Sequence, residues 1–227
     1  MIKVVSPASP IRSVQLFVFA LLVCVATPLE MKRILVTGGN KGIGRAICTG
    51  LLQQHKEVHI ILGSRDKARG EQVMKEIAKE IGADICANRM EMVVLDTSSD
   101  ESVLQAAEQL KDKPLYGIVN NAGILRGSVQ DVVNVNYLGS KRIVEAFRPQ
   151  LQKPKGRIVN IASASGPCYV QGLGDRAVFS KLSQPWTTSM VELDEKARTC
   201  CKSRDAIAEP YGFSKALVNA WTLLLAR

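Results

Sequence analysis

The segment that most constrains the fold is residues 32–45, KRILVTGGNKGIGR. A short apolar run ends at Thr37, glycines follow at Gly38, Gly42 and Gly44, and the pattern then becomes helical. This order predicts a buried β-strand, a glycine turn and the start of a helix. Glycines let a ligand approach the backbone, and free N–H groups at a helix start attract phosphate. A glycine turn without a ligand is the competing interpretation, but the strand-to-helix placement favours a phosphate site.

Strand and helix patterns alternate along the chain. Buried strands are predicted at 58–63, 92–95 and 115–119. Helices are predicted at 42–55, 66–82 and 100–111. Such alternation is typical of right-handed βαβ crossovers. The predicted fold class is therefore α/β, a Rossmann-type, doubly wound parallel sheet with helices on both faces.

Composition excludes several classes of function. The 227 residues suffice for one α/β domain with a sizeable core, and the net charge is +9. The charge forms no lysine/arginine block and has no interleaved aromatic residues, so we expect no nucleic-acid partner. Six cysteines without a C-x-x-C pair, and only His55 and His59, predict a reduced intracellular domain and no metal site.

The first thirty residues contain an apolar segment, 14–26, that follows basic residues. Three interpretations remain open: a signal sequence, an uncleaved membrane anchor, or a non-native extension with translation starting at Met31. A start at Met31 predicts a cytoplasmic protein, and the other two predict a secretory or membrane-associated one. In each case residues 1–30 lie outside the fold, and the domain is expected to span 31–227.

Residues after the second and third strands bear on the choice of nucleotide. Arg65 follows the strand at 58–63, where an arginine accommodates the 2′-phosphate of NADP and an acidic residue would bind the ribose of NAD. Lys41 adds a second cation, so NADP(H) is favoured over a merely solvated Arg65. Asp96 has two interpretations, a contact with the adenine amino group or a cap for the helix that starts near Ser99.

At residues 120–123 the resemblance of the sequence to the short-chain dehydrogenase/reductase family becomes specific. The segment Asn120-Asn121-Ala122-Gly123 carries the resemblance together with residues 37–44. Further segments match in order at 134–139 (NVNYLG), 156–163 (GRIVNIAS) and 211–215 (YGFSK). The likeness extends from Lys32 to Arg227. The glycine loop and the long stretch between Ser163 and Tyr211 are similar to the carbonyl-reductase-like branch, whose members reduce aldehydes, ketones and quinones with NADPH.

The resemblance implies a cofactor site and a set of catalytic residues. The implied cofactor-binding residues are Thr37, Gly38, Asn40, Lys41, Gly42, Ile43, Gly44, Arg65, Asp96, Thr97, Asn120, Ala122, Gly123, Tyr211 and Lys215. The implied catalytic residues are Asn136, Ser163, Tyr211 and Lys215.

The chemistry of these residue types suits carbonyl reduction. Tyr211 and Lys215 lie one helical turn apart, and an adjacent ammonium favours the phenolate of a tyrosine. Tyr211 is therefore the expected general acid for a carbonyl oxygen, and Ser163 a hydrogen-bond donor to the same oxygen. In the family, the residue that Asn136 resembles holds a water that relays protons to the lysine. A surface helix pair is the competing interpretation of Y-x-x-x-K, and the upstream motifs favour catalysis.

Three departures from the family pattern accompany the resemblance. The connection from Gly123 to Asn136 is short, which either removes the start of the interface helix or narrows one pocket wall. An insertion at 166–210, with a charged helix at 191–205, covers the oligomerisation face in relatives and predicts a monomer. The chain stops at Arg227, before the family's last strands, and would leave the fifth strand as an exposed edge.

Two functions of different classes follow. The first is an NADPH-dependent reductase of a small-molecule aldehyde, ketone or quinone. The second is a truncated NADP-binding remnant, or a gene-model fragment, without turnover. A membrane-tethered reductase is a third interpretation and requires residues 14–26 to act as an anchor.

Overall fold

The computed structural model describes residues 30–173, 182, 188–202 and 209–226, with no side chains described at 200–202. Its contacts separate residues 1–31 from the unit 32–227. The apolar segment 14–26 lies outside the described residues. None of the helices in the described part of the chain is both long enough and apolar enough to cross a membrane.

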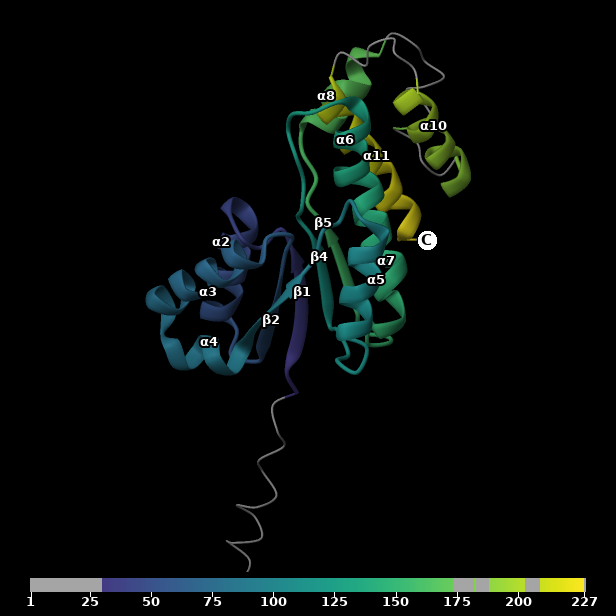
Figure 1. Ribbon diagram of the computed structural model, residues 1–227. Helices are drawn as coiled ribbons and strands as arrows, with labels where there is room; N and C mark the ends of the chain where they lie inside the picture. Colours follow the sequence, from purple (N-terminus) through teal and green to yellow (C-terminus); the bar gives the residue numbers. More distant parts are fainter. Residues whose placement is uncertain (1–29, 174–181, 183–187, 203–208, 227) are drawn as a thin grey trace, which may run out of the picture. The chain divides into compact units, whose positions relative to one another are not determined.

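In the described residues, five parallel strands form a sheet in the order β3-β2-β1-β4-β5 (Figure 1). The strands are β1 (Lys32–Thr37), β2 (Val58–Ser64), β3 (Met90–Val94), β4 (Gly117–Asn120) and β5 (Arg157–Asn160). β1 is central, and its Ile34 pairs with Ile60 of β2 and Gly117 of β4. This order confirms the predicted doubly wound sheet. β5 forms one edge, where the Val159 side chain is 48% exposed.

One face of the sheet is covered by the helices that follow β1 and β2. These are α2 (Gly42–Gln54), α3 (Lys67–Ile81) and α4 (Ala83–Arg89). Their apolar side chains, such as Leu52 and Ile77, pack against Val36 and Ile60 of the strands. Asp66 caps α3 by accepting a hydrogen bond from the backbone N–H of Arg69 at 3.0 Å. α4 is not among the predicted helices.

The opposite face is covered by helices that follow β3 and β4. These are α5 (Asp100–Gln109), α6 (Val129–Val133), the π-helix η1 (Asn134–Leu138), α7 (Gly139–Phe147) and the 3₁₀ turn η2 (Arg148–Gln150). Alternate strand residues face this side, so Leu35 and Ile61 pack against Val103 of α5 and Phe147 of α7. The two apolar layers explain why the strands read as continuous hydrophobic runs.

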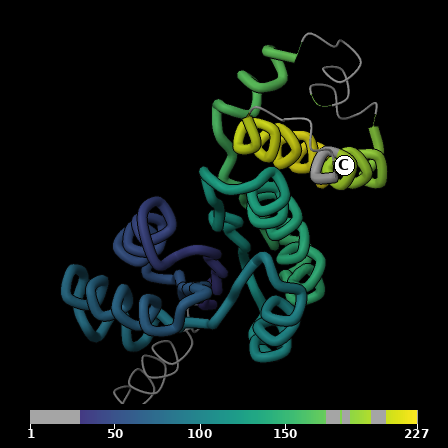
Figure 2. Tube along the Cα trace, turned by 45° about the horizontal axis from the view of Figure 1, so that its top comes forward, coloured from purple at the N-terminus to yellow at the C-terminus, as the bar shows by residue number. Residues whose placement is uncertain are grey.

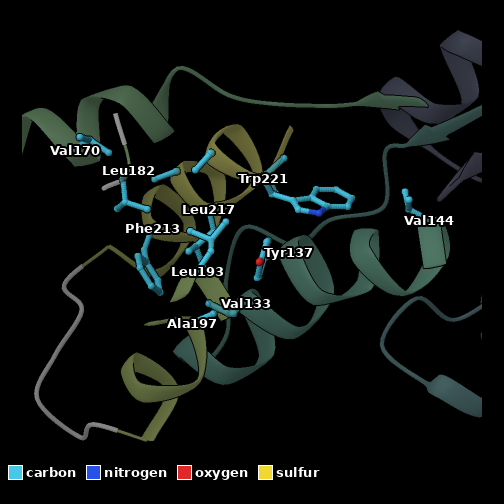
Figure 3. Packing of buried hydrophobic residues seen from close by; sticks show 13 residues of the cluster. Val133, Tyr137, Val144, Val170, Leu182, Leu193, Ala197, Phe213, Leu217 and Trp221 are labelled. Carbon is cyan, nitrogen blue, oxygen red and sulfur yellow. The ribbon is translucent and has the colours of Figure 1, made fainter. Parts of the chain in front are cut away.

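The helix that bears the Y-x-x-x-K motif forms a third apolar cluster. Further helices in the described part of the chain are α8 (Ser165–Gly172), α10 (Met190–Lys202) and α11 (Pro210–Leu225). Figure 2 shows α10 beside α11, and Figure 3 shows Leu193 and Ala197 of α10 near Phe213 and Leu217 of α11. α10 is the charged helix predicted within the insertion at 166–210.

The short connection after β4 leads into α6, whose start is capped by its own residues. α6 begins after Ser128, whose hydroxyl accepts a hydrogen bond from the backbone N–H of Asp131 at 3.1 Å. The Asp131 carboxylate in turn accepts from the backbone N–H of Ser128 at 3.3 Å, which completes a capping box. The capping box therefore defines where α6 begins.

Candidate active site

The glycine turn between β1 and α2 is fixed by residues that follow β4. Gly38 has a φ of 63°, a left-handed conformation that side chains other than glycine rarely adopt. The Thr37 hydroxyl accepts hydrogen bonds from the backbone N–H groups of Asn121 at 3.1 Å and Ala122 at 3.0 Å. The Asn121 side chain donates to the carbonyl oxygens of Thr37 at 2.9 Å and Gly38 at 3.2 Å. The two loops therefore form one rigid unit.

The start of α2 offers backbone donors to an anion. Lys41, at the N-cap, makes no side-chain capping bond within the described part of the chain, and the first turn of α2 has no acidic residue. The first N–H groups of a helix lack partners inside the helix and carry the positive end of its dipole. At Gly44, a Cβ atom would lie 2.4 Å from the Gly38 carbonyl oxygen. This position therefore needs glycine, and the turn fits a phosphate group.

A cavity of about 670 Å³ lies where the five strands end. Its wall includes most of the residues predicted from the sequence to bind cofactor or substrate. These are Gly38, Asn40, Lys41, Gly42, Ile43, Gly44, Arg65, Asp96, Thr97, Ala122, Gly123, Ser163, Tyr211 and Lys215. The cavity thus brings the glycine turn together with a serine from the loop after β5 and with tyrosine and lysine side chains from α11.

Lys215 is held against the end of β5. Its ammonium donates a 2.6 Å hydrogen bond to the carbonyl oxygen of Ile161 and lies 5.7 Å from the ring centroid of Tyr211. The residue is only 6% exposed, and this burial lowers the pKa of the lysine below its ordinary value. The Ser163 hydroxyl accepts a 3.2 Å hydrogen bond from the backbone N–H of Ser165 and keeps its proton for another acceptor.

Thr37 and Asn120 lie behind the cavity wall rather than in it. Thr37 is 1% exposed, and its hydroxyl carries the loop contacts described above. The Asn120 side chain donates to Asn160 Oδ1 at 2.8 Å, and Asn160 in turn donates to the Thr222 hydroxyl at 2.8 Å. This chain of hydrogen bonds links β4, β5 and α11. Both residues therefore support the site indirectly.

Asn136 also lies outside the cavity wall and is 1% exposed. Its side-chain oxygen accepts from the backbone N–H of Ile124 at 2.8 Å, and its amide donates to the Ile124 carbonyl at 3.0 Å. The same amide donates to the Ser214 hydroxyl at 2.9 Å. Asn136 therefore ties the loop after β4 to α11, directly beside Lys215.

The cavity wall carries several basic residues near the ends of β1 and β2. Besides Lys41 and Arg65, the wall includes Arg69 from the first turn of α3 and the carboxylate of Asp66. The Asp66 carboxylate is occupied at one oxygen as the cap of α3. Arg69 is not among the site residues predicted from the sequence. Its position four residues after Arg65 is the signal that could have identified it.

Asp96 and Thr97 line the cavity after β3. The Asp96 carboxylate accepts from the backbone N–H of Ser98 at 2.9 Å and from the Ser98 hydroxyl at 2.6 Å. Ser99, not Asp96, caps α5, since its hydroxyl accepts from the Ser102 N–H at 3.2 Å. The capping interpretation of Asp96 is therefore wrong. Apolar residues after β4, Ile124 and Leu125, also face the cavity and had no signal in the sequence.

Comparison with known proteins agrees with this geometry. The family model described as short chain dehydrogenase matches residues 32–175. Estradiol 17-beta-dehydrogenase 2 from Mus musculus is 27% identical over 158 residues, which cover 63% of this chain and 39% of the mouse protein. Short-chain dehydrogenase/reductase 1 from Saponaria officinalis is 30% identical over 237 aligned positions, covering 85% of this chain and 75% of that protein.

A solved structure gives a similar result. Menthone neomenthol reductase from Mentha piperita superposes with a TM-score of 0.77 at 26% identity, covering 86% of this chain and 85% of that one. The chain thus spans well under half of the mouse dehydrogenase but most of the peppermint reductase. With the matched family model and the fold in agreement, the chain belongs to the short-chain dehydrogenase/reductase family, oxidoreductases that use a nicotinamide cofactor.

Proposed function

We propose that this chain is an NADPH-dependent reductase of a small aldehyde, ketone or quinone. The observation that carries the proposal is that Ser163, Tyr211 and Lys215 line the same cavity as the glycine turn. A proton donor, a hydrogen-bond donor and a buried cation then lie within reach of one bound nucleotide. The nicotinamide of the cofactor supplies the hydride when it is bound.

In this proposal the protein supplies the proton and the electrostatic environment. Tyr211 protonates the carbonyl oxygen of the substrate as negative charge develops there. Ser163 donates a hydrogen bond to the same oxygen, because its hydroxyl proton is free of the contact with Ser165. Lys215 keeps a positive charge 5.7 Å from the ring of Tyr211 and so favours its phenolate after proton transfer.

The preference for NADP rests on charge at the nucleotide end of the cavity. Lys41, Arg65 and Arg69 all line it. A guanidinium suits the 2′-phosphate of NADP because its planar fork binds phosphate oxygens in pairs. Asp66 is the residue that would favour NAD, but its carboxylate already caps α3. The basic side chains therefore outweigh it in this proposal.

The names of relatives are consistent with alcohol–carbonyl chemistry. Menthone neomenthol reductase from Mentha piperita is named for the reduction of a ketone, and estradiol 17-beta-dehydrogenase 2 for the oxidation of an alcohol. These names cover both directions of one reaction class. The basic nucleotide end favours NADPH and hence reduction as the direction for this chain.

The position of α10 also bears on the proposed monomer. α10 packs against α11 through Leu193 and Ala197, and these two side chains are 2% and 0% exposed. A helix in this place shields the side of α11 from another protein. Sedimentation at micromolar concentration is expected to give a single species of monomer mass, and a stable dimer would overturn the proposed monomer.

Oxidation of NADPH with a panel of quinones, ketones and aldehydes tests the proposed function. Turnover by the wild-type chain and its loss, by roughly 10²–10⁴-fold, in Tyr211→Phe is the expected result. Arg65→Asp should weaken NADPH binding and leave NADH binding intact or improved. A folded wild-type chain that binds NADPH without turnover would instead support the alternative, a non-catalytic NADP-binding remnant.

A further inference from the structure

Asp194 of α10 makes a polar contact with Tyr137, which belongs to the apolar cluster around α11. Its carboxylate accepts a 2.7 Å hydrogen bond from the hydroxyl of Tyr137 and forms an ion pair with Lys141. Tyr137 is fully buried, and the side chains of Asp194 and Lys141 are only 17% and 20% exposed. A carboxylate in such a place is stabilised only if both partners stay in position.

Tyr137 belongs to η1, the single turn of π-helix between α6 and α7. A π-turn carries one residue more than an α-helical turn and occurs often at functional sites. Tyr137 is held on its other side by Trp221, at 6.3 Å between ring centroids and edge to face (Figure 3 shows both side chains). Burial and the Asp194 carboxylate raise the pKa of Tyr137, so its hydroxyl stays protonated and remains the donor.

The neighbouring residue in η1 reaches the candidate active site. Asn136 binds both backbone polar groups of Ile124, at 2.8 Å and 3.0 Å, and Ile124 lines the cavity. Asn136 also binds the hydroxyl of Ser214, which precedes Lys215 in α11. The orientation of the π-turn therefore decides where this wall of the cavity and this turn of α11 lie.

We propose that Asp194 is a positioning residue that holds the π-turn in register through Tyr137, so that Asn136 can fix Ile124 and Ser214 at the active site. The reductase activity it serves rests on the proposed function, whereas the coupling itself is a property of the described contacts. Asp194 lies on another helix and touches none of the cavity-lining residues in the described contacts.

Packing alone does not account for this arrangement. Leu193 and Ala197 already hold α10 in the apolar cluster, and both are buried. Loss of the Asp194 carboxylate is therefore expected to leave α10 in place and release the Tyr137 hydroxyl. Loss of the Tyr137–Asp194 hydrogen bond from either side removes the polar contact that holds the π-turn to α10, so the π-turn is expected to move more freely.

The test compares amide hydrogen exchange and steady-state kinetics in the full chain. The variants are Tyr137→Phe, Asp194→Ala, their double variant and Asp194→Asn, which retains a carbonyl acceptor. The control is Ser189→Ala, which removes the hydroxyl that accepts from the Glu192 N–H at 3.2 Å near the start of α10 and leaves Asp194 intact. The control loosens the same helix without touching Tyr137.

We expect Asp194→Ala and Tyr137→Phe each to speed exchange of the Ile124 amide by roughly tenfold, and the double variant to do no more than either. Asp194→Asn should restore most of the protection. In steady-state kinetics, kcat of Asp194→Ala and of Tyr137→Phe should fall by a similar factor, while KM for NADPH stays within about twofold of the wild-type value. Ser189→Ala should change neither the exchange of the Ile124 amide nor kcat.

Unchanged protection of Ile124 in both single variants would overturn the proposal. So would additive effects in the double variant, or an equal loss in Ser189→Ala, because these would indicate general loosening of α10. If the wild-type chain shows no turnover at all, the proposed function fails, and the exchange of Ile124 still decides whether Asp194 positions the π-turn.

Discussion

The ammonium of Lys215 donates a 2.6 Å hydrogen bond to the carbonyl oxygen of Ile161, the residue directly after β5. This contact joins the middle of α11 to the end of the sheet. It also keeps a cation in a place from which most water is excluded, and burial lowers the pKa of the lysine. The charged form of the lysine is therefore disfavoured in the folded chain and costs stability.

Replacement of Lys215 by methionine should separate stability from activity. Because the folded-state pKa is lowered, the charged lysine destabilises the fold below that pKa, and this effect fades as the pH rises toward the ordinary value of about 10.5. Lys215→Met should therefore raise the melting temperature at pH 7, less so at pH 10, and reduce turnover by roughly 10²–10⁴-fold. Thermal melts and NADPH oxidation measure both, with Lys75→Met on the exposed side of α3 as control. A lower melting temperature at pH 7 would contradict this.

Replacement of two glycines of α2 by alanine should have opposite effects on the stability of the fold. A Cβ at Gly44 would lie 2.4 Å from backbone and side-chain atoms, whereas a Cβ at Gly50 meets nothing within 4 Å. Gly44→Ala should cost about 1–3 kcal/mol and weaken cofactor binding. Gly50→Ala should stabilise the chain by about 0.5–1 kcal/mol because it favours the helix. Urea denaturation with and without NADPH measures both, and equal effects would be inconsistent with the described turn.

Replacement by valine should also affect stability differently at two buried threonines, Thr37 and Thr49. Thr37→Val removes the hydroxyl that accepts from the N–H groups of Asn121 and Ala122, and should cost roughly 1–3 kcal/mol. Thr49 is also buried, but among the described residues its hydroxyl has no hydrogen-bond partner. Thr49→Val should therefore be neutral or stabilising. Denaturant titration of both variants checks the difference, and a larger loss at Thr49 would refute it.

His59 should make the fold sensitive to acid. Burial, and secondarily the Arg33 guanidinium, lower its pKa, against the opposing effect of Glu91, whose carboxylate lies 3.3 Å from Nε2. The unfolded chain therefore binds a proton near pH 6.5 while the folded chain does not, and stability falls as the pH drops through the lowered pKa. His59→Gln should flatten this fall. The free energy of unfolding at pH 8 and pH 5 tests this, and parallel losses in both proteins would argue against it.

The sheet could be predicted because its strands carry their own signal. A strand buried on both faces must be apolar throughout, and Ile60-Ile61-Leu62 is such a run. The missed helix, α4, lacks a comparable signal. It is held by Arg89, whose guanidinium donates to the carbonyl oxygens of Val58 at 2.9 Å and Leu52 at 3.0 Å. Because those acceptors are 31 and 37 positions away from Arg89, no local sequence pattern predicts α4.

The candidate active site likewise combines residues that have a local sequence signal with residues whose roles depend on contacts between distant segments. The glycine turn and the Y-x-x-x-K spacing are local patterns, and the residues they contain meet in one cavity. Asn136 was identified by its motif, but its partners Ile124 and Ser214 depend on how η1 meets α11. Asp194 had no motif at all, since its role depends on a hydroxyl 57 positions away in the chain.

The central place of β1 has a consequence for synthesis in the cell. The glycine turn leaves the ribosome well before β4, yet Thr37 and Gly38 are fixed by Asn121, which directly follows β4. At 5–20 residues per second the nascent chain needs roughly ten seconds to add that strand. During this interval the first strand has no β4 beside it. Under the proposed function, the glycine turn can therefore bind the cofactor in its described conformation only after β4 and Asn121 have been made.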